Sequence, residues 1–448
     1  MTAAARSYQA NRVSLAKALR PESIDELQQC IDPGVAVPFP LRPRGGCTAS
    51  TDCNTSSGGL VIETTGLNRI LIIDPDNQRV TVEAGVRLQD LVNALDEFGL
   101  ELPGCFDLYR HTVGGAVAAP CFGPGVGEDA ASLARQIISM KIVTPSGELV
   151  SISADDSRFM PLFRASYGLL GVIAEVCFRV RPKRVFDRTY KKVSHEQLLR
   201  TLETLADLPI GLKFFVLPHR DRAYLEVLRQ TESTRSIHDR FWKAKDWGET
   251  VVLPTIFRSL NKVVPMPTLR YRLIDGVSGI TKDLSQSRLF ETGSYSVAAG
   301  YRQTGSTSDT ANYSTWLFSA SRASEIAEDY IEFCQSLFER TGYRADLPTV
   351  GFRVAKDPSA LMSPSRSRAM IALQTSSTRT DGWEDFVIDL ADFAEAHGGV
   401  PVFNQTRAVR SGYAQRVYGD ALNNFVAMRR KLDADNRLLN PFLSQYFR

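Results

Sequence analysis

Residues 110–125 read RHTVGGAVAAPCFGPG. Apart from Arg110, His111 and Phe122, its side chains are small, apolar or both. Such residues let backbone N–H groups come close to a flat or anionic partner, although a tightly packed turn in a core explains the glycines equally well. A second glycine-rich loop, RPRGGCTAS, occupies residues 42–50. Two such loops in one half of the chain favour a large phosphate-bearing cofactor.

Length and composition narrow the class of protein. A chain of 448 residues is too long for one compact core and should form two domains. The formal charge of +3 is too small to favour nucleic acid as a partner. Apolar runs are too short for a membrane span, and no signal peptide is visible at the start. Seven cysteines without a CxxC pair favour reduced thiols and a cytoplasmic protein, and the five histidines never fall at metal-ligand spacing, so we expect no metal.

The pattern of apolar residues predicts an α+β protein, because strands and helices occur without strict alternation. Helices are expected over residues 21–31, 87–98, 156–165, 195–206, 323–340, 383–397 and 420–431. Strands are expected over residues 35–41, 60–63, 70–73, 80–83, 137–143, 149–152, 172–180, 212–217, 223–228, 295–300, 313–320, 350–354, 369–375 and 400–403. Residues 235–275 are basic and aromatic and are interpreted as a loop-rich lid, with a membrane-surface patch as the alternative.

Several motifs in order resemble the vanillyl-alcohol-oxidase (p-cresol methylhydroxylase, PCMH) superfamily of FAD-linked oxidoreductases. They are RGGCTASTD at 44–52, GGLVIE at 58–63, TVGGAV at 112–117 and GLLGVI at 168–173. Together with the strand at 82–86 and the turn at 143–148 they cover nearly all of the first 180 residues. The C-terminal run from 398 to 433 is similar to the closing segment of sugar oxidases in this superfamily, in particular aldonolactone and alditol oxidases and decaprenylphosphoryl-ribose 2'-oxidase.

The resemblance implies a fold and a domain plan. It implies a PCMH-type FAD-binding domain of two α+β subdomains over residues 1–183. A substrate (cap) domain with a mainly antiparallel sheet flanked by helices would follow over 184–400, and residues 401–448 would return to the FAD domain. The implied FAD-binding residues are Arg44, Gly45, Gly46, Cys47, Thr48, Ala49, Thr112, Gly114, Gly115, Val117, Ala118, Cys121, Gly123 and Ile173.

Three residues depart from the pattern of this family. Many relatives attach the flavin covalently to a histidine, and here Thr48 stands at about that position, so we expect non-covalent FAD. A link through Cys47 or Cys121 is the less favoured alternative. Phe122 stands where relatives often have histidine, and Gln405 where sugar oxidases have a catalytic lysine. A glutamine side chain forms hydrogen bonds to a hydroxyl but is no practical base.

The family therefore implies an FAD-dependent oxidoreductase. It would transfer a hydride from a hydroxyl-bearing carbon of a sugar-like or polyol-like small molecule to flavin N5, with reoxidation by O₂ or another acceptor. The substrate-side candidates are Asn404, Gln405 and Arg407, with Tyr295 and Tyr301 from the second domain. The loss of the lysine keeps open a flavin-dependent C=C reductase or a dehydrogenating or cyclising tailoring enzyme. A non-catalytic binding subunit with the flavin fold is the remaining alternative, and the oligomeric state stays open.

Overall fold

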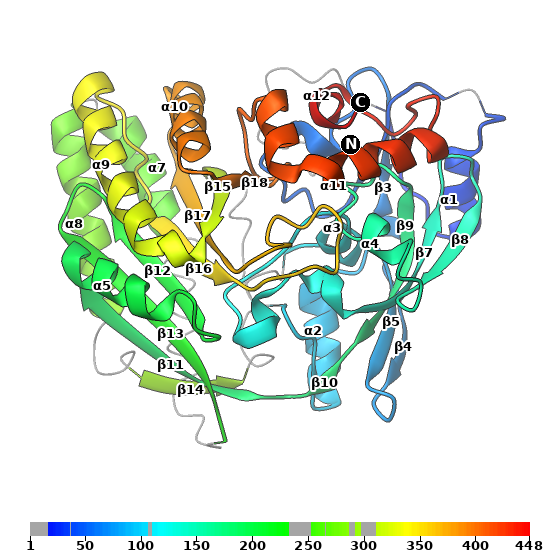
Figure 1. Cartoon of the computed structure of the whole chain (residues 1–448), viewed down its shortest axis with the longest axis horizontal. Coiled ribbons are helices and arrows are strands. Elements are labelled where there is room, and N and C mark those ends of the chain that lie inside the picture. The colour runs from blue at the N-terminus through cyan, green and yellow to red at the C-terminus, as the bar shows by residue number, and fades with distance from the viewer. Residues whose placement is uncertain are drawn as a thin grey trace.

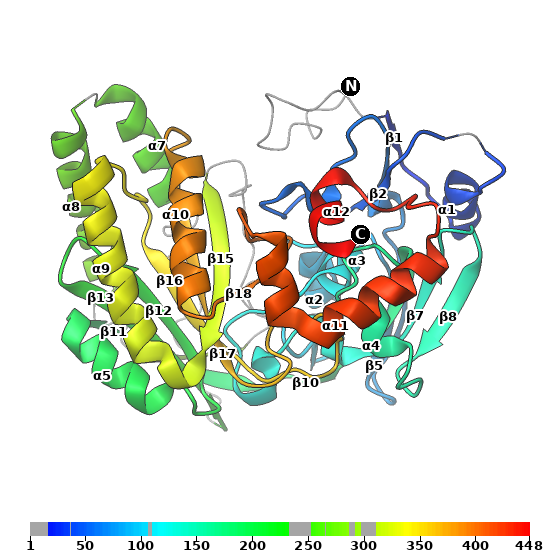
Figure 2. The ribbon, with the colours of Figure 1, turned by 45° about the horizontal axis from the view of Figure 1, so that its top comes forward.

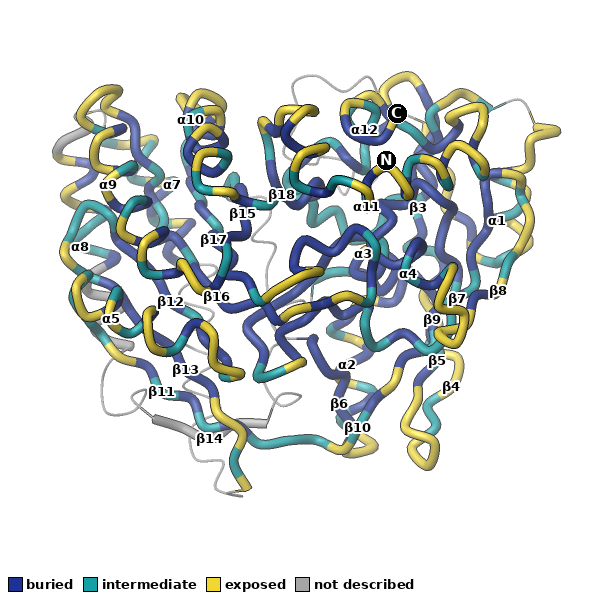
Figure 3. Tube along the Cα trace, viewed as in Figure 1, coloured by how far each residue is buried: buried dark blue, intermediate teal, exposed yellow. Residues whose placement is uncertain are grey.

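A computed structural model describes residues 17–35, 37–105, 110–232, 252–264, 266–285, 292–296 and 311–448. The chain forms two units that lie side by side (Figure 1). We call the unit that holds strands β1 to β10 the N-terminal unit, and the unit that holds β11 to β18 the cap. Buried residues concentrate on the strands and between the units, whereas the outer helices expose one side (Figure 3). The predicted α+β class is confirmed.

The N-terminal unit contains two main sheets. A parallel sheet has the order β1 (Lys17–Leu19), β3 (Leu60–Glu63), β2 (Leu41–Arg44). An antiparallel sheet has the order β4 (Ile70–Asp74), β5 (Arg79–Glu83), β9 (Val172–Arg179), β7 (Ile137–Val143), β8 (Leu149–Ser153). Its helices are α1 (Ile24–Ile31), α2 (Leu88–Glu97), α3 (Val113–Ala118) and α4 (Met160–Phe163), and a small ladder joins β6 (Leu100–Glu101) to β10 (Arg181–Pro182). Two α+β subdomains are thus present, as the sequence predicts.

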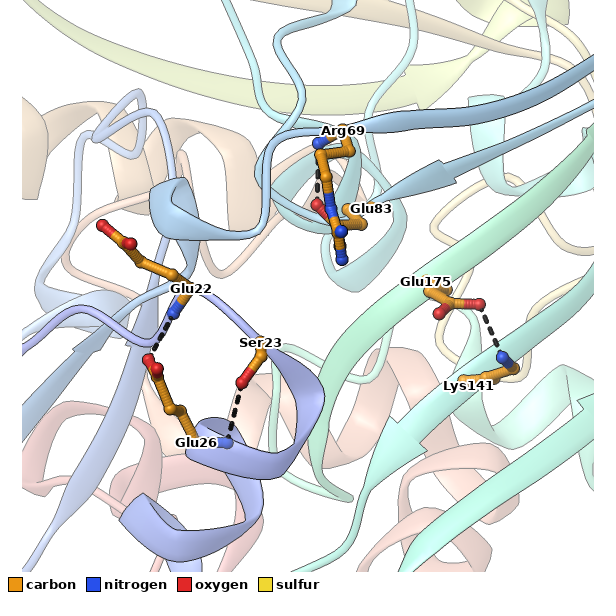
Figure 4. A network of polar contacts seen from close by, with 7 residues as sticks. All are labelled: Glu22, Ser23, Glu26, Arg69, Glu83, Lys141 and Glu175. Atoms are coloured by element: carbon orange, nitrogen blue, oxygen red, sulfur yellow. Dashed lines mark hydrogen bonds and ion pairs between the residues drawn. The ribbon is translucent and has the colours of Figure 1, made fainter.

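Local polar contacts fix these elements (Figure 4). Helix α1 begins after Ser23, whose Oγ accepts a hydrogen bond from the backbone N–H of Glu26 at 3.2 Å. A serine hydroxyl in this position is a favourable N-cap, and it starts the helix three residues after the predicted beginning at residue 21. Glu83 is buried and accepts hydrogen bonds from the guanidinium of Arg69, which joins the ends of the β4–β5 hairpin.

The cap is built on one antiparallel sheet of eight strands. Its order is β14 (Thr292–Ser296), β11 (Val185–Val193), β13 (Arg222–Thr231), β12 (Gly211–Leu217), β16 (Thr349–Val354), β17 (Met370–Ser377), β15 (Asn312–Ser319), β18 (Val400–Pro401). One face is covered by helices α5 (His195–Leu205), α7 (Leu253–Val263), α8 (Pro267–Ser285), α9 (Ala323–Thr341) and α10 (Trp383–Ala396) (Figures 1 and 2). The other face is turned toward the N-terminal unit, where Phe352 packs against Phe122 with ring centroids 6.3 Å apart. The predicted antiparallel, helix-flanked sheet is confirmed.

The C-terminal segment packs on the N-terminal unit. It contains α11 (Ser411–Leu432), which bends at Gly419, and α12 (Pro441–Phe447). The backbone N–H of Leu41 donates to the carbonyl O of Arg437 at 2.7 Å, so the end of the chain lies beside β2. Among the described helices, none is both long and apolar enough to cross a bilayer. The exact domain boundaries at 183 and 400 stay predictions.

Several sequence predictions are wrong. The strand expected at 35–41 is not formed; β2 begins only at Leu41, because Pro38 and Pro40 remove backbone donors from that segment. The helix expected at 156–165 is a single turn, since the backbone of Ala165 turns left-handed (φ 54°). The helix expected at 420–431 begins nine residues earlier, at Ser411.

The loop-rich lid expected at 235–275 is also wrong where the structure describes it. Residues 253–263 and 267–275 are helical and belong to α7 and α8. Phe257, Tyr271 and Ile274 pack together in one apolar cluster, which makes these two segments a helical hairpin. Residues 235–251 and 297–301 of the predictions lie outside the described residues. The sequence patterns did not reveal β11, β1 or α12.

One glycine tests how tightly the cap sheet packs. A Cβ at Gly351 on β16 would overlap the ring of the buried Phe214 on β12. We expect Gly351→Ala to lower the Tm by about 2–6 °C, because overpacking a core costs about 1–3 kcal/mol. Differential scanning calorimetry measures it. The matched control is Gly412→Ala on α11, where a Cβ meets nothing within 4 Å; an equal loss of Tm in both variants would contradict the packing argument.

Candidate functional site

The two glycine-rich loops meet in the N-terminal unit. A Cβ at Gly45 would overlap Oγ1 of Thr112, and a Cβ at Gly46 would lie 2.8 Å from the carbonyl O of Arg110. Thr112 is itself fixed as the N-cap of α3, where its Oγ1 accepts a hydrogen bond from the N–H of Gly115. The backbones of loops far apart in the sequence therefore touch, and only glycine fits at Gly45.

A cavity opens beside this contact. It contains about 750 Å³ of empty space, part of it open to solvent. A concave site of this kind, lined by residues distant in the sequence, is where ligands typically bind. The predicted cofactor residues that line it are Arg44, Gly45, Gly46, Cys47, Thr48, Ala49, Gly114, Gly115, Ala118, Cys121 and Ile173. The structure thus brings most of the predicted set to one place.

Three predicted cofactor residues do not line the cavity. Val117 is fully buried in the main core, and its carbonyl O accepts from the N–H of Ala165 at 2.9 Å. Thr112 stays behind the loop as the cap of α3, and Gly123 lies in a turn, where its carbonyl O accepts from Gly125. These positions support the shape of the loop from outside the cavity.

Of the residues predicted to contact substrate, only some line the cavity in the structure. Asn404 is buried and lines the cavity, and among the described residues no donor reaches its Oδ1. The side chains of Gln405 and Arg407 are not part of the cavity lining. Tyr295 lies on β14, but its side chain is outside the described part, as is the whole of Tyr301.

Residues 403–407 bind the first glycine-rich loop through a set of hydrogen bonds. The N–H of Ser50 donates to the carbonyl O of Asn404 at 3.0 Å, and its Oγ donates to that of Gln405 at 3.0 Å. Thr51 Oγ1 donates to the carbonyl O of Phe403 at 2.7 Å, and Arg407 Nε donates to Ser50 O at 2.8 Å. The segment after β18 therefore holds the loop in place and carries Asn404 into the cavity.

The cap reaches the same loop from the other side. The hydroxyl of Tyr313 on β15 donates to the carbonyl O of Thr48. Burial raises the pKa of Tyr313, so its phenol keeps its proton at neutral pH and stays a donor. The cavity thus takes its shape from both units and from the C-terminal segment.

Sequence reasoning missed other lining residues. Arg42 is buried and donates to the carbonyl oxygens of Tyr167 and Leu438, both at 2.6 Å. Burial lowers its pKa to about 10, which still leaves it charged at neutral pH. The remaining members are Pro43, Cys53, Asn54, Thr64, His111, Ala119, Tyr167, Gly168 and Gly171. Only their place next to glycine motifs could have indicated them.

The charge and backbone of the lining fit an anionic ligand. None of the described residues that line the cavity carries a carboxylate, whereas Arg42 is cationic; the charge of Arg44 is paired with Glu63. Cys47 and Tyr167 have left-handed backbones (φ 54° and 53°), a conformation that side chains disfavour and that clusters at ligand-binding sites. A left-handed residue within a loop aims successive N–H groups at one point, as in anion-binding nests.

These features fit FAD. Both glycine-rich loops line the cavity, the loop at 45–49 can offer backbone donors to a pyrophosphate, and the buried Oδ1 of Asn404 can accept from a bound ring or substrate. In the described part of the chain, no group of three or more His, Cys, Asp or Glu side chains could hold a metal ion.

Comparison with known protein families identifies the class of this protein. Residues 16–153, which contain both glycine-rich loops, match the FAD-binding domain family. Residues 176–446 match the D-arabinono-1,4-lactone oxidase family. This match spans more than half of the chain, and the protein belongs to that family.

Individual proteins that are similar to this chain also act on sugar lactones, as their names state. The chain is 31% identical over 214 residues to L-gulono-1,4-lactone dehydrogenase of Mycobacterium tuberculosis, covering 48% of this chain and 49% of the relative. It is 28% identical over 210 residues to the mitochondrial L-galactono-1,4-lactone dehydrogenase of Brassica oleracea, covering 45% and 33%. The alignments thus span half or less of these relatives.

Solved structures share the fold. A variant of cholesterol oxidase from Brevibacterium sterolicum superposes with a TM-score of 0.78 at 12% identity, over 96% of this chain and 94% of that chain. The BBE-like 1 protein of Physcomitrella patens gives a TM-score of 0.65 at 13% identity, over 96% of this chain and 91% of that chain. The PCMH-type fold implied by the motifs is therefore confirmed.

The contact between the two loops can be tested directly. We expect Gly45→Ala to weaken FAD binding at least about 10-fold, because the new methyl group forces the loops apart. Flavin fluorescence titration of the apoprotein measures the dissociation constant. Thr112→Ala on its own removes a helix cap, so we expect a modest loss.

A double variant tests whether Gly45 and Thr112 share this contact. Gly45→Ala with Thr112→Ala removes the hydroxyl that the new methyl group would strike, so the two effects should be less than additive. Strict additivity would show that the two residues do not share a contact.

Proposed function

We propose that the protein is an FAD-dependent oxidoreductase that oxidises a hydroxyl-bearing carbon of a small sugar lactone or polyol. The observation that carries this proposal is that both glycine-rich loops and Asn404 line one cavity. Family membership and the lactone-oxidising relatives support it. When bound, FAD would supply the chemistry by accepting a hydride at N5 and passing the electrons to O₂ or another acceptor.

The residues of this chain would bind the cofactor and orient the substrate. The backbone N–H groups of the loop at 45–49 would hold the anionic part of the cofactor. Arg42 supports this part of the lining through its hydrogen bonds to Tyr167 and Leu438. Asn404 Oδ1 would accept a hydrogen bond from a substrate hydroxyl and so hold the carbon in place. Tyr313 and residues 403–407 keep the loop fixed while substrate binds.

The substrate test uses the lactones that name the relatives. Under anaerobic conditions, L-gulono-, L-galactono- or D-arabinono-1,4-lactone should bleach the flavin of the purified protein. We expect Asn404→Ala to lower kcat/KM about 10–100-fold without loss of flavin, since one hydrogen bond to the reacting molecule is lost. The matched control is Asn423→Ala, whose exposed side chain on α11 accepts only from Gln415 among the contacts of the described residues.

A second reaction class has its own supporting observation. The described lining holds neither lysine nor carboxylate, so a base for hydroxyl deprotonation is restricted to His111, a thiol or a phenol. A C=C reductase, or a dehydrogenating or cyclising tailoring enzyme, would need that base less. Flavin that is bleached by no lactone or polyol, while its reduced form is reoxidised by an enone, would favour this class.

We propose that FAD is held without a covalent bond. Thr48 offers no imidazole, and burial raises the pKa of the Cys121 thiol to about 12, so the reactive thiolate is scarce at neutral pH. The thiol of Cys47 donates to the carbonyl O of Gly45 at 3.7 Å. We expect acid precipitation to leave the flavin in the supernatant; flavin in the pellet that Cys121→Ser abolishes would contradict this.

We also propose that the protein works in a reducing compartment, as the cytoplasm is. All seven cysteines are free thiols, and Cys53, Cys105, Cys121 and Cys334 are buried. Reduced, buried thiols are typical of proteins that never meet an oxidising environment.

A further inference from the structure

The α7–α8 hairpin lies in the outer helical layer of the cap, at the end of the molecule away from the N-terminal unit (Figures 1 and 2). Its inner face is anchored. Asn261 Nδ2 donates to Asp346 Oδ2 and to Thr378 Oγ1, both at 2.7 Å, and Arg344 donates to Asp275 at 2.7 Å. The hairpin is therefore held in one position against the cap.

The outer face of the same hairpin is apolar. Val263, at the end of α7, is 76% exposed, and Met266, just before α8, is 61% exposed. Leu269 and Leu273 follow at 47% and 42%. Spacings of three and four residues put Met266, Leu269 and Leu273 on one side of the helix. Large exposed side chains elsewhere in the described part occur singly or in a strand pair, so this cluster stands out.

The charged residues of the hairpin itself have one sign from 253 to 274. Residues 253–274 contain Arg258, Lys262, Arg270 and Arg272 and no Asp or Glu, in a chain whose charges otherwise nearly balance. Lys262 and Arg272 are exposed beside the apolar side chains. The first acidic residue after this run, Asp275, is paired with Arg344 and Arg220. Apolar side chains flanked by cations are complementary to an anionic lipid bilayer, whose acyl chains lie beneath negatively charged headgroups.

We propose that the α7–α8 hairpin docks this protein on anionic lipid bilayers. The side chains of Val263, Met266, Leu269 and Leu273 enter the boundary between headgroups and acyl chains, and Lys262 and Arg272 contact lipid phosphates. None of the described residues that line the cofactor cavity belongs to α7 or α8, so docking through the hairpin uses a separate part of the molecule. The proposal does not depend on the reaction that the cavity catalyses.

The test is co-sedimentation of the purified full chain with vesicles. We expect binding to phosphatidylcholine vesicles that contain about 30% phosphatidylglycerol, and binding at least about 10-fold weaker to pure phosphatidylcholine. Met266→Ser with Leu269→Ser should lower the partition coefficient at least about 10-fold on anionic vesicles. Lys262→Gln with Arg272→Gln should lower it several-fold there, and high salt should do the same.

The control variant carries Phe98→Ser and Ile388→Ser, two exposed apolar side chains outside the hairpin, and should bind as the unchanged protein does. Thermal unfolding and flavin content show that each variant is folded. Absence of binding to anionic vesicles overturns the proposal, and so does equal binding by the hairpin variant. A concentration-dependent dimer in sedimentation velocity that the hairpin variant abolishes also overturns it, because a second copy then covers this face.

Discussion

The structure depends on one close approach, the backbone of Gly45 against the hydroxyl of Thr112. Any side chain at Gly45 would separate the loops, and the wall of the cavity would open. Because Thr112 also caps α3, the same contact fixes the start of the segment that carries Gly114, Gly115 and Ala118 into the lining. Residues 403–407 and Tyr313 then hold the first loop from two further directions. The cavity is a product of three distant parts of the chain.

The sequence alone was sufficient to predict elements that depend on nearby residues. The cap at Ser23, the hairpin of β7 and β8, and the helices α5, α9 and α10 follow from capping residues, turn residues and apolar periodicity. The strand expected at 35–41 was wrong since its apolar residues alternate with prolines, which cannot join a ladder. The helices α7 and α8 were missed because their basic and aromatic residues hide a buried stripe that only the partners Phe338 and Leu347 reveal.

For the site, motif order identified the loops but not the direction of each side chain. Asn404 and Gln405 are neighbours, and only contacts with Ser50 and Thr51 decide that the first enters the cavity. Arg407 was expected to face substrate, yet its guanidinium donates to Ser50 O and to Glu384. Arg42 lies in a strand that the sequence placed too early, so its role in joining Tyr167 and Leu438 had no visible signal. Pairings across more than three hundred residues leave no local trace.

The buried guanidinium of Arg42 has a consequence for how the protein is made. It joins β2 near the start of the chain to Leu438 near its end, while Asn404 supplies part of the cavity wall. During translation the early segments leave the ribosome first and begin to fold before the late ones exist. The nascent chain therefore presents an incomplete cradle, with Arg42 still lacking its partner, until Leu438 has been added. A chain that stops before Asn404 would lack both that part of the cavity wall and the carbonyl partner of Arg42 at Leu438, so assembly of the cradle is a late event in synthesis.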